Sequence, residues 1–356
     1  MSFDPTYPHE LAPLPPAGIS NSDFYELLLP ARVALAELKG ACSEMPNPML
    51  LMAPIMVRES VASSNIENIN TTLANVLQGQ LFPEVEQRPP DKEVLRYRAA
   101  MSWGFEILDQ IPISTRMITG IQSILIPEGN GKFRREQNQI ANLTTLKPLY
   151  TPPPAQDVNK LINNWEIFVN NTDNTLDPLI RASIAHYQFE AIHPFRDGNG
   201  RTGRILMILQ LIQSGLLDYP VLYISSFINE HRSLYYESLL NVTIKNDWKG
   251  YINYLLNGFF TQAKATRTTL TQINHLYKLI RDQVKRENSK IFSLELIETL
   301  FSTPILTPTV LAEKMDIHYT TASKHLKSME EMGILRATWV GKHHLYANTQ
   351  LLELLQ

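Results

Sequence analysis

The sequence is poor in several features that would assign it to a familiar class. Cys42 is its only cysteine among 356 residues, which excludes an internal disulfide framework. Apolar runs such as residues 205–212 are far shorter than the roughly 20 residues that span a bilayer. The first 16 residues are proline-rich and acidic, unlike a secretory signal. These absences predict a cytoplasmic protein with no membrane partner.

Net charge is also scarce, and this limits the class of partner. The formal charge of −3 gives no global attraction to nucleic acid, so such binding would need a local basic patch. Hydrophobic residues make up 44% and charged residues 19%, which is typical of globular chains and not of disordered ones. At this length the chain is expected to form two or three units with ordinary cores.

Helical periodicity dominates the first 288 residues. Apolar side chains recur at steps of three and four, the spacing of one helix face. The predicted helices cover residues 24–39, 49–77, 92–109, 155–216 with an interruption at 194–200, 233–241 and 248–286. Proline at position 54 predicts a break in the second of them, and Gly258 marks another candidate break.

One stretch of this region, residues 127–154, cannot form a long helix. It contains Gly129, Gly131 and three consecutive prolines at positions 152–154. We expect a short β-hairpin near residues 132–142, followed by a loop that the prolines hold in place.

The last 68 residues have the element order of a winged helix-turn-helix. Three short helices are followed by Gly333 and an alternating stretch, with residues 320–332 as the candidate recognition helix. Over residues 290–356, however, six Lys and Arg face seven Asp and Glu, so the positive charge expected for phosphate binding is missing. DNA binding is left open but not favoured, and a protein-interaction or dimerisation module fits at least as well.

The polar loop between two strongly apolar helices is the feature that indicates chemistry. The helix over residues 179–192 delivers His193 at its end, and Pro194 stops it. Two glycines follow within three residues, and a helix that is apolar nearly all round resumes over residues 205–212. The loop should therefore lie at the N-terminus of a buried helix.

Such a terminus is a natural anion site, because its N–H groups lack partners inside the helix. Arg201 and Arg204 are three residues apart and can hold successive phosphates of one polyphosphate. Asp197 offers a hard oxygen ligand for Mg²⁺, and His193 can take a proton from a hydroxyl at neutral pH. These parts indicate phosphoryl or nucleotidyl transfer without choosing between them.

A rival reading of the same loop is a dinucleotide-binding fingerprint. Residues 198–203 match G-x-G-x-x-G, but that motif requires a strand before it and a βαβ unit around it. The preceding segment is helical in pattern, so we do not favour this reading.

Residues 193–204, HPFRDGNGRTGR, resemble the motif H-x-F-x-[DE]-G-N-G-R-x-x-R of Fic-domain adenylyltransferases at every specified position. The resemblance extends over the flanking helices, the hairpin region and the tail. It implies that His193 deprotonates a target Tyr, Ser or Thr hydroxyl, which attacks the α-phosphate of ATP and expels pyrophosphate. ATP would be the substrate and Mg²⁺ the cofactor, with Asp197 as the metal ligand.

The same resemblance implies which residues hold the nucleotide. Gly198, Asn199 and Gly200 would form the phosphate cradle, while Arg201 and Arg204 would reach the outer phosphates. Thr202 and Gly203 belong to the same nucleotide-binding run, and Tyr236 would line the adenosine end. The hairpin near residues 132–142 would be the flap along which family members align the target by main-chain pairing.

A second, weaker motif precedes the first by more than a hundred residues. Residues 63–68, SSNIEN, resemble the inhibitory pattern [ST]-x-x-x-E-[GN] of the family, with Ser63 and Glu67 at the specified positions. By this resemblance Glu67 would pair with Arg204 and occupy the arginine that the γ-phosphate of ATP needs. The resting enzyme is then expected to be autoinhibited.

Together these observations predict an all-α Fic fold with a small β-hairpin flap, followed by a winged helix-turn-helix. The predicted domains are an N-terminal helical region with the inhibitory helix (1–100), the catalytic domain (101–288) and the winged-helix-like domain (289–356). The predicted activity is AMP transfer to a target protein or to the chain itself. Removal of AMP at the same site and a nucleotide-sensing DNA-binding regulator are the alternatives. The target protein and homodimerisation are left open.

Overall fold

The computed structural model describes residues 3–142, 145–173, 175–341 and 343–355. Two compact units form, each from two stretches of the chain. The first unit comprises Met1–Ala36 and Arg96–Ala263, and the second comprises Glu37–Leu95 and Lys264–Gln356. The three-part division from sequence stays a prediction, since compact units need not follow sequence modules. Among the described residues no helix is both long and apolar enough to cross a bilayer.

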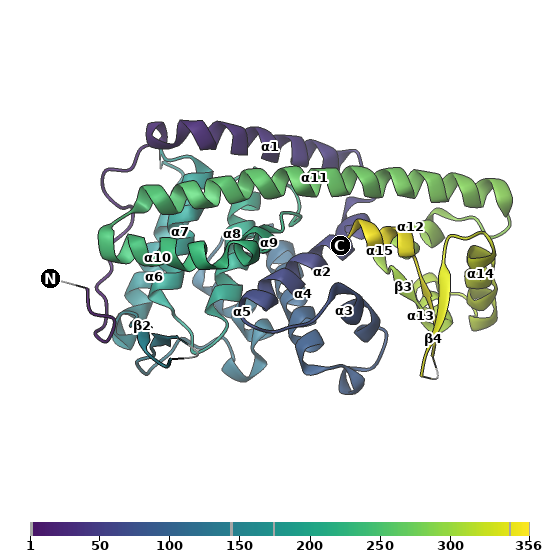
Figure 1. The fold of residues 1–356 in the computed structure, drawn as a ribbon, viewed down its shortest axis with the longest axis horizontal. Coiled ribbons are helices and arrows are strands. Elements are labelled where there is room, and N and C mark those ends of the chain that lie inside the picture. Colours follow the sequence, from purple (N-terminus) through teal and green to yellow (C-terminus); the bar gives the residue numbers. More distant parts are fainter. Residues whose placement is uncertain (1–2, 143–144, 174, 342, 356) are drawn as a thin grey trace. The chain divides into compact units, whose positions relative to one another are not determined.

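The first unit is helical, as the sequence predicts (Figure 1). Its own helices are α5 (Thr115–Leu125), α6 (Val158–Asn170), α7 (Pro178–Ile192), α8 (Asn199–Gln213), α9 (Ile224–Glu230) and α10 (Arg232–Lys245). Both units receive parts of α1 (Tyr25–Ser43), α4 (Pro89–Leu108) and α11 (Trp248–Glu287).

The two helices that flank the candidate loop are the most deeply buried part of this unit. α7 begins with proline at its first position, after Asp177, whose side chain accepts a hydrogen bond from the N–H of Leu179 (2.9 Å). The indole N–H of Trp165 on α6 donates to the carbonyl of Ala185 on α7 (2.7 Å). α8 packs along α7, and nearly all of its side chains are buried. The loop between them is therefore held by a rigid scaffold.

The hairpin exists, but it lies further along the chain than the sequence suggested. Its strands are β1 (Ile140–Ala141) and β2 (Pro148–Tyr150), antiparallel and with an irregular register. Residues 132–139 form an arm without a strand, because their polar groups bind elsewhere. The N–H of Arg134 donates to Pro194 O (2.8 Å), and the side-chain amide of Asn138 donates to Phe195 O (3.3 Å). A sheet ladder cannot use the backbone N–H of Arg134, because that group already binds the candidate loop.

Two predicted helix breaks are misplaced. Pro54 lies inside α2 (Pro48–Ile66), and the break comes after Glu67, where Asn68 takes a left-handed conformation (φ 62°) before α3 (Leu73–Gly79). α11 continues through Gly258 as one helix of 40 residues. A Cβ at Gly258 would lie 2.8 Å from the ring of Phe227, so this glycine permits close packing against α9 and does not end the helix.

In the second unit the winged-helix order is confirmed. Its elements are α12 (Leu294–Ser302), β3 (Ile305–Leu306), α13 (Pro308–Met315), α14 (Tyr319–Glu331), β4 (Arg336–Val340), β5 (His343–Ala347) and α15 (Thr349–Leu354). The three strands form an antiparallel sheet in the order β3-β5-β4. β4 and β5 fall on the predicted alternating stretch, whereas β3 was not predicted.

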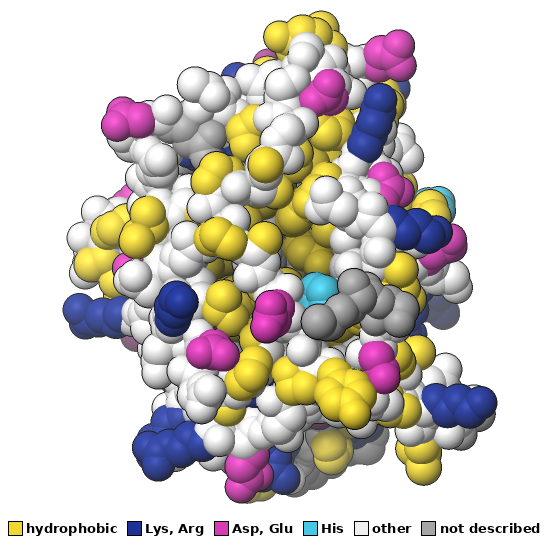
Figure 2. Space-filling view, turned by 90° about the vertical axis from the view of Figure 1, so that its left-hand side faces the viewer, with side chains coloured by type: hydrophobic (Ala, Val, Ile, Leu, Met, Phe, Trp, Pro, Cys, Tyr) yellow, Lys and Arg dark blue, Asp and Glu magenta, His cyan; other side chains and the backbone are white. Residues whose placement is uncertain are grey.

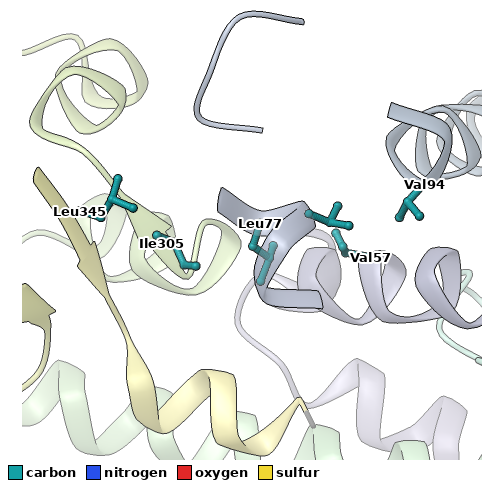
Figure 3. Close-up of a cluster of buried hydrophobic side chains, with 6 residues drawn as sticks. Val57, Leu77, Val94, Ile305 and Leu345 are labelled. Carbon is teal, nitrogen blue, oxygen red and sulfur yellow. The ribbon is translucent and has the colours of Figure 1, made fainter. Parts of the chain in front are cut away.

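The core of the second unit joins helices from the N-terminal part of the chain to the winged-helix sheet. Val57 of α2, Leu77 of α3 and Val94 of α4 are buried in one cluster with Ile305 of β3 and Leu345 of β5 (Figure 3). α2 also packs against α12. The helix that carries Ser63 and the winged helix therefore share one hydrophobic core.

Truncating this core should destabilise the second unit measurably. Ile305→Ala removes three buried carbons at a site that is 2% exposed, and such changes cost about 2–5 kcal/mol of unfolding free energy. Urea denaturation followed by circular dichroism measures the loss. The matched variant Leu294→Ala truncates an exposed side chain and should change the unfolding free energy by less than about 0.5 kcal/mol. Equal effects of the two variants would contradict the assigned core.

Candidate active site

On the face of the molecule shown in Figure 2, acidic and basic side chains lie singly and interspersed. No broad field of one sign marks this face. On such a surface, a site for an anionic ligand would be built from local groups: backbone amides, a helix terminus and individual arginines.

His193 caps the C-terminus of α7 in a left-handed conformation (φ 49°, ψ 59°), and its N–H donates to Phe189 O (3.1 Å). Left-handed geometry is uncommon for a side chain with a Cβ, so the surroundings must hold it. The imidazole is half-buried, and its Nδ1 lies 3.3 Å from Glu190 O. Because a carbonyl can only accept, Nδ1 carries the proton and Nε2 keeps its lone pair. The sequence prediction that a helix ends by presenting His193 is confirmed.

Asn199 closes the loop that follows. Its side chain accepts from the N–H of Phe195 (2.8 Å) and donates to Phe195 O (2.9 Å), and it is only 3% exposed. A buried amide that is satisfied in both directions fixes the loop in one shape. Gln122 of α5 supports the same loop, since its side-chain amide donates to Asp197 O (3.3 Å).

Gly198 is the residue at which the chain enters α8. It is left-handed (φ 82°), and a Cβ there would lie 3.1 Å from Ile126. The first turn of α8 closes when the N–H of Thr202 donates to Gly198 O (2.9 Å). The amides of Asn199, Gly200 and Arg201 precede that bond and point out of the helix end. The predicted buried helix N-terminus is therefore present in the structure, and its use as an anion site stays a prediction.

The two arginines of the motif are both buried, on the first turns of α8. Arg201 is 3% exposed and its Nη2 lies 3.9 Å from Oδ1 of Asp197. Arg204 is 1% exposed and acts electrostatically on His186 and Tyr235. Buried guanidinium groups at the positive end of a helix need anionic partners. The positive charge gathered here suits a polyphosphate.

The remaining members of the motif run, Thr202 and Gly203, are buried under this turn. A Cβ at Gly203 would lie 2.3 Å from Oε1 of Glu190, so only glycine lets α7 and α8 approach this closely. These two residues therefore shape the helix pair, and direct contact with a nucleotide stays a prediction for them.

Asp197 is the one motif carboxylate, and it is suited to a shared metal. Its side chain is 69% exposed, and Oδ1 accepts from the N–H of Gly198 (2.6 Å). Within the described ranges no three His, Cys, Asp or Glu side chains are grouped to hold a metal ion by themselves. Mg²⁺ is commonly held by one or two carboxylates together with substrate phosphates and waters. One exposed carboxylate beside an anion site fits that arrangement.

A buried polar cluster lies behind the motif. His186 of α7 is 1% exposed, and its Nε2 lies 2.8 Å from the hydroxyl of Tyr235 on α10. Burial, together with the positive charge of Arg204, lowers the pKa of His186 to about 3. Burial also raises the pKa of Tyr235 well above its usual value, with Glu190 adding to the shift. Both side chains are therefore neutral near pH 7.

This cluster predicts a specific dependence of stability on pH. Unfolded, His186 binds a proton near pH 6.5, whereas folded it does so near pH 3, so stability is lost as pH falls through this window. At pH 5 the loss is about 2 kcal/mol relative to pH 7.5. His186→Gln keeps a partner for Tyr235 and should lose about 2 kcal/mol less than the unchanged chain over the same interval. Urea denaturation at both pH values measures this, and identical losses in the two proteins would contradict it.

Arg134 is the supporting residue that sequence reasoning missed. Its Nε donates to His193 O (2.9 Å) and its Nη2 to Ile192 O (3.3 Å) and to Pro153 O. The guanidinium thus binds the main chain on both sides of the α7 terminus and fastens the proline loop to it. A buried arginine in an irregular segment leaves no periodic signal, so nothing in the sequence distinguished it from Arg135.

Tyr150, at the end of β2, adds a further support. Its hydroxyl donates to Ala191 O (3.0 Å), two residues before His193, and burial raises its pKa well above the usual value. The hairpin and α7 are therefore linked directly.

The tyrosine pair on α10 is divided between core and surface. Tyr235 is buried, whereas Tyr236 is 46% exposed, with the guanidinium of Arg232 5.9 Å from its ring centroid. Of the two, only Tyr236 has a ring that solvent reaches, so it is the one that a base could approach. Its role in nucleotide binding stays a prediction.

Ser63 and Glu67 lie in the other unit, at the end of α2. Ser63 is buried, and Glu67 is the exposed C-terminal cap of that helix. The sequence expected Glu67 within a longer helix, and the structure places it at a helix end. Its inhibitory role stays a prediction.

Family models match most of the chain. Residues 25–106 match the Fic/DOC family N-terminal model, residues 112–211 the Fic/DOC family model, and residues 276–351 the model of the protein adenylyltransferase SoFic-like C-terminal domain. The matched Fic/DOC segment contains the end of α7, the loop and most of α8.

Individual relatives agree with these matches. A "Protein adenylyltransferase Fic" from Aedes aegypti is 34% identical over 207 residues, covering 54% of this chain and 38% of that protein. The chain thus matches well under half the length of this relative. A Fic family protein from Desulfovibrio desulfuricans G20 has a similar fold, with a TM-score of 0.61, 20% identity, and coverage of 94% of this chain and 98% of that one. A Fic domain containing signaling protein from Bacteroides thetaiotaomicron gives a TM-score of 0.55 at 15% identity, covering 69% and 97%.

Proposed function

Because the chain belongs to the Fic/DOC family, we propose that it transfers AMP from ATP to a hydroxyl group of a target protein. The observation that carries the proposal is the geometry of one loop. His193 lies at the end of α7, and six residues later the chain begins α8, whose first turns carry two buried arginines. A proton acceptor and a polyphosphate site are thereby held next to each other.

In the proposed reaction, Nε2 of His193 takes the proton of the target hydroxyl. The hydroxyl oxygen forms a bond to the α-phosphorus of ATP, the bond to the bridging oxygen of the β-phosphate breaks, and pyrophosphate leaves. The amides that open α8, together with Arg201 and Arg204, would neutralise the phosphate charge. Mg²⁺ held by Asp197 and the phosphates would supply further charge neutralisation.

The regulatory part of the proposal concerns the other unit. We infer that Glu67 restrains transfer by competing with the γ-phosphate for Arg204. Support for this role comes from the match of residues 63–68 to the inhibitory pattern. A cytoplasmic location stays a prediction from the sequence, while the target protein, homodimerisation and DNA binding stay open.

A labelling experiment distinguishes AMP transfer from phosphoryl transfer. The Glu67→Gly chain is incubated with Mg²⁺ and ATP labelled at the α- or the γ-phosphate, with and without cell lysate. Protein labelled from the α-position only is the expected result. Label from the γ-position would instead show phosphoryl transfer, and no label from either would refute the proposed reaction.

Arg134 provides a test of how the scaffold supports the base. Arg134→Ala removes donors from the carbonyls of Ile192 and His193, so the imidazole should lose its fixed position. We expect kcat for AMP transfer to fall about tenfold to a hundredfold, while KM for ATP changes by less than about threefold. Arg134→Lys should restore only part of the rate, because an ammonium lacks the planar fork.

The matched control is Arg135→Ala, which alters the neighbouring arginine, an exposed side chain that contacts none of these carbonyls. With a target that lacks acidic residues, the Arg135→Ala variant should have a kcat within about twofold of that of the unchanged chain. A parallel rise in KM for ATP and fall in kcat after Arg134→Ala would show general loss of structure instead of lost positioning.

A further inference from the structure

A cavity of about 460 Å³ opens beside the arm that leads into the hairpin. One wall comes from the arm, and the other comes from the short helical turn and the start of α6 that follow the proline loop. Its lining residues are Lys132, Phe133, Arg134, Arg135, Ala155, Gln156 and Asn159. None of them belongs to the motif loop, so this cavity is separate from the proposed polyphosphate site.

The cavity carries positive charge that the described part of the chain does not neutralise. Lys132 and Arg135 are exposed on its arm side, and neither has a described carboxylate within 4.0 Å. The acidic residues nearest in sequence, Glu128 and Glu136, form no ion pair with them. Gln156 and Asn159 add side-chain amide donors on the opposite wall. Two cations with amide donors form a site for an anionic group.

The cavity wall is fixed to the catalytic loop. Between the two cations, Arg134 donates from its Nε to His193 O (2.9 Å) and from its backbone N–H to Pro194 O (2.8 Å). The ring of Phe133 packs against Phe195, with centroids 5.2 Å apart. Lys132 is two residues from Arg134 along the chain, and Arg135 is one residue from it. The hydrogen bonds of Arg134 therefore fix the positions of both relative to the backbone of His193.

We propose that this pocket binds an acidic side chain of the target segment, close in sequence to the hydroxyl that receives AMP. The proposal rests on the proposed function. An extended segment advances about 3.3–3.6 Å per residue, so a side chain two to four positions from the acceptor reaches about 7–14 Å from it. The pocket then selects targets by charge, while the hairpin aligns their main chain. A carboxylate and a phosphorylated side chain share the chemistry that these cations recognise.

The test uses the full chain with Glu67→Gly and synthetic peptides. Each peptide has one acceptor hydroxyl, from Tyr, Thr or Ser, in a neutral background. Glutamate, phosphoserine, glutamine or lysine is placed at each of the four positions on either side of it. AMP transfer from α-labelled ATP gives kcat/KM for each peptide, and self-modification of the chain is recorded in parallel.

At the preferred position we expect an acidic peptide to exceed its glutamine counterpart about three- to tenfold, the range of two exposed ion pairs. Comparison of the glutamate peptides with the phosphoserine peptides shows whether a carboxylate or a phosphate is favoured. In the variant Lys132→Gln with Arg135→Gln the acidic-to-neutral ratio should fall to about one. In Lys132→Glu with Arg135→Glu the preference should invert toward lysine peptides. The control Arg116→Gln with Lys249→Gln removes the same charge from exposed positions on α5 and α11 and should keep the acidic preference.

Equal rates for acidic and neutral peptides would overturn the pocket assignment, as would an acidic preference that survives both changes at Lys132 and Arg135. Self-modification without transfer to any peptide would also overturn it, while leaving AMP transfer intact. Absence of both self-modification and peptide transfer would refute the proposed function, and the pocket assignment with it.

Discussion

Replacing Glu67 with glycine is expected to raise AMP transfer by the purified chain about tenfold to a hundredfold. A carboxylate paired with a buried guanidinium contributes about 1.5–3 kcal/mol, and this is the free energy that ATP would no longer have to overcome at Arg204. The readout is the initial rate of α-label incorporation into the chain or into lysate proteins, at fixed Mg²⁺ and ATP.

The control for this variant is Glu331→Gly. Glu331 is also an exposed glutamate at the C-terminal end of a helix, α14, so it reproduces the loss of charge and the added backbone freedom. Its rate should stay within about twofold of the unchanged chain. Equal activation by both variants would show that loosening the second unit, and not removal of the Glu67 carboxylate, releases the enzyme.

The second large effect is expected at His193, tested in the activated Glu67→Gly chain. His193→Ala should lower the rate of AMP transfer by about 10²- to 10⁴-fold, the usual contribution of a general base. Because His193 is left-handed, alanine also strains the end of α7.

His193→Asn separates these two consequences. Asparagine tolerates left-handed geometry but cannot act as the base, so it should be as inactive as alanine and more resistant to thermal unfolding. Binding of a non-hydrolysable ATP analogue should persist in the asparagine variant. Retained transfer in His193→Asn would exclude His193 as the proton acceptor.

Local patterns predicted the central part of the site because its signals are local. The helix that ends at His193, the glycine at which the next helix begins and the burial of that helix follow from periodicity, proline and glycine. The same applies to the winged helix, whose element order is confirmed. In both places the residues that determine the geometry lie within a few positions of it.

The misplaced elements depend on long-range contacts. The hairpin is displaced because the backbone N–H of Arg134 binds the carbonyl of residue 194, 60 positions away. Gly258 leaves α11 intact because its missing Cβ admits Phe227 from another helix. The shared core of Val57 and Ile305 likewise joins residues almost 250 positions apart. Periodicity within one segment carries no information about such partners.

The proposed activity requires that a nucleotide polyphosphate binds to the amides that open α8, with the imidazole of His193 beside the α-phosphate. A crystal structure of the Glu67→Gly chain with Mg²⁺ and a non-hydrolysable ATP analogue would show whether it does. Phosphate oxygens are expected within hydrogen-bond distance of the amides at positions 199–201, with Arg201 and Arg204 on the outer phosphates. A nucleotide bound away from this helix end, or one whose α-phosphate lies out of reach of His193, would contradict the proposed activity.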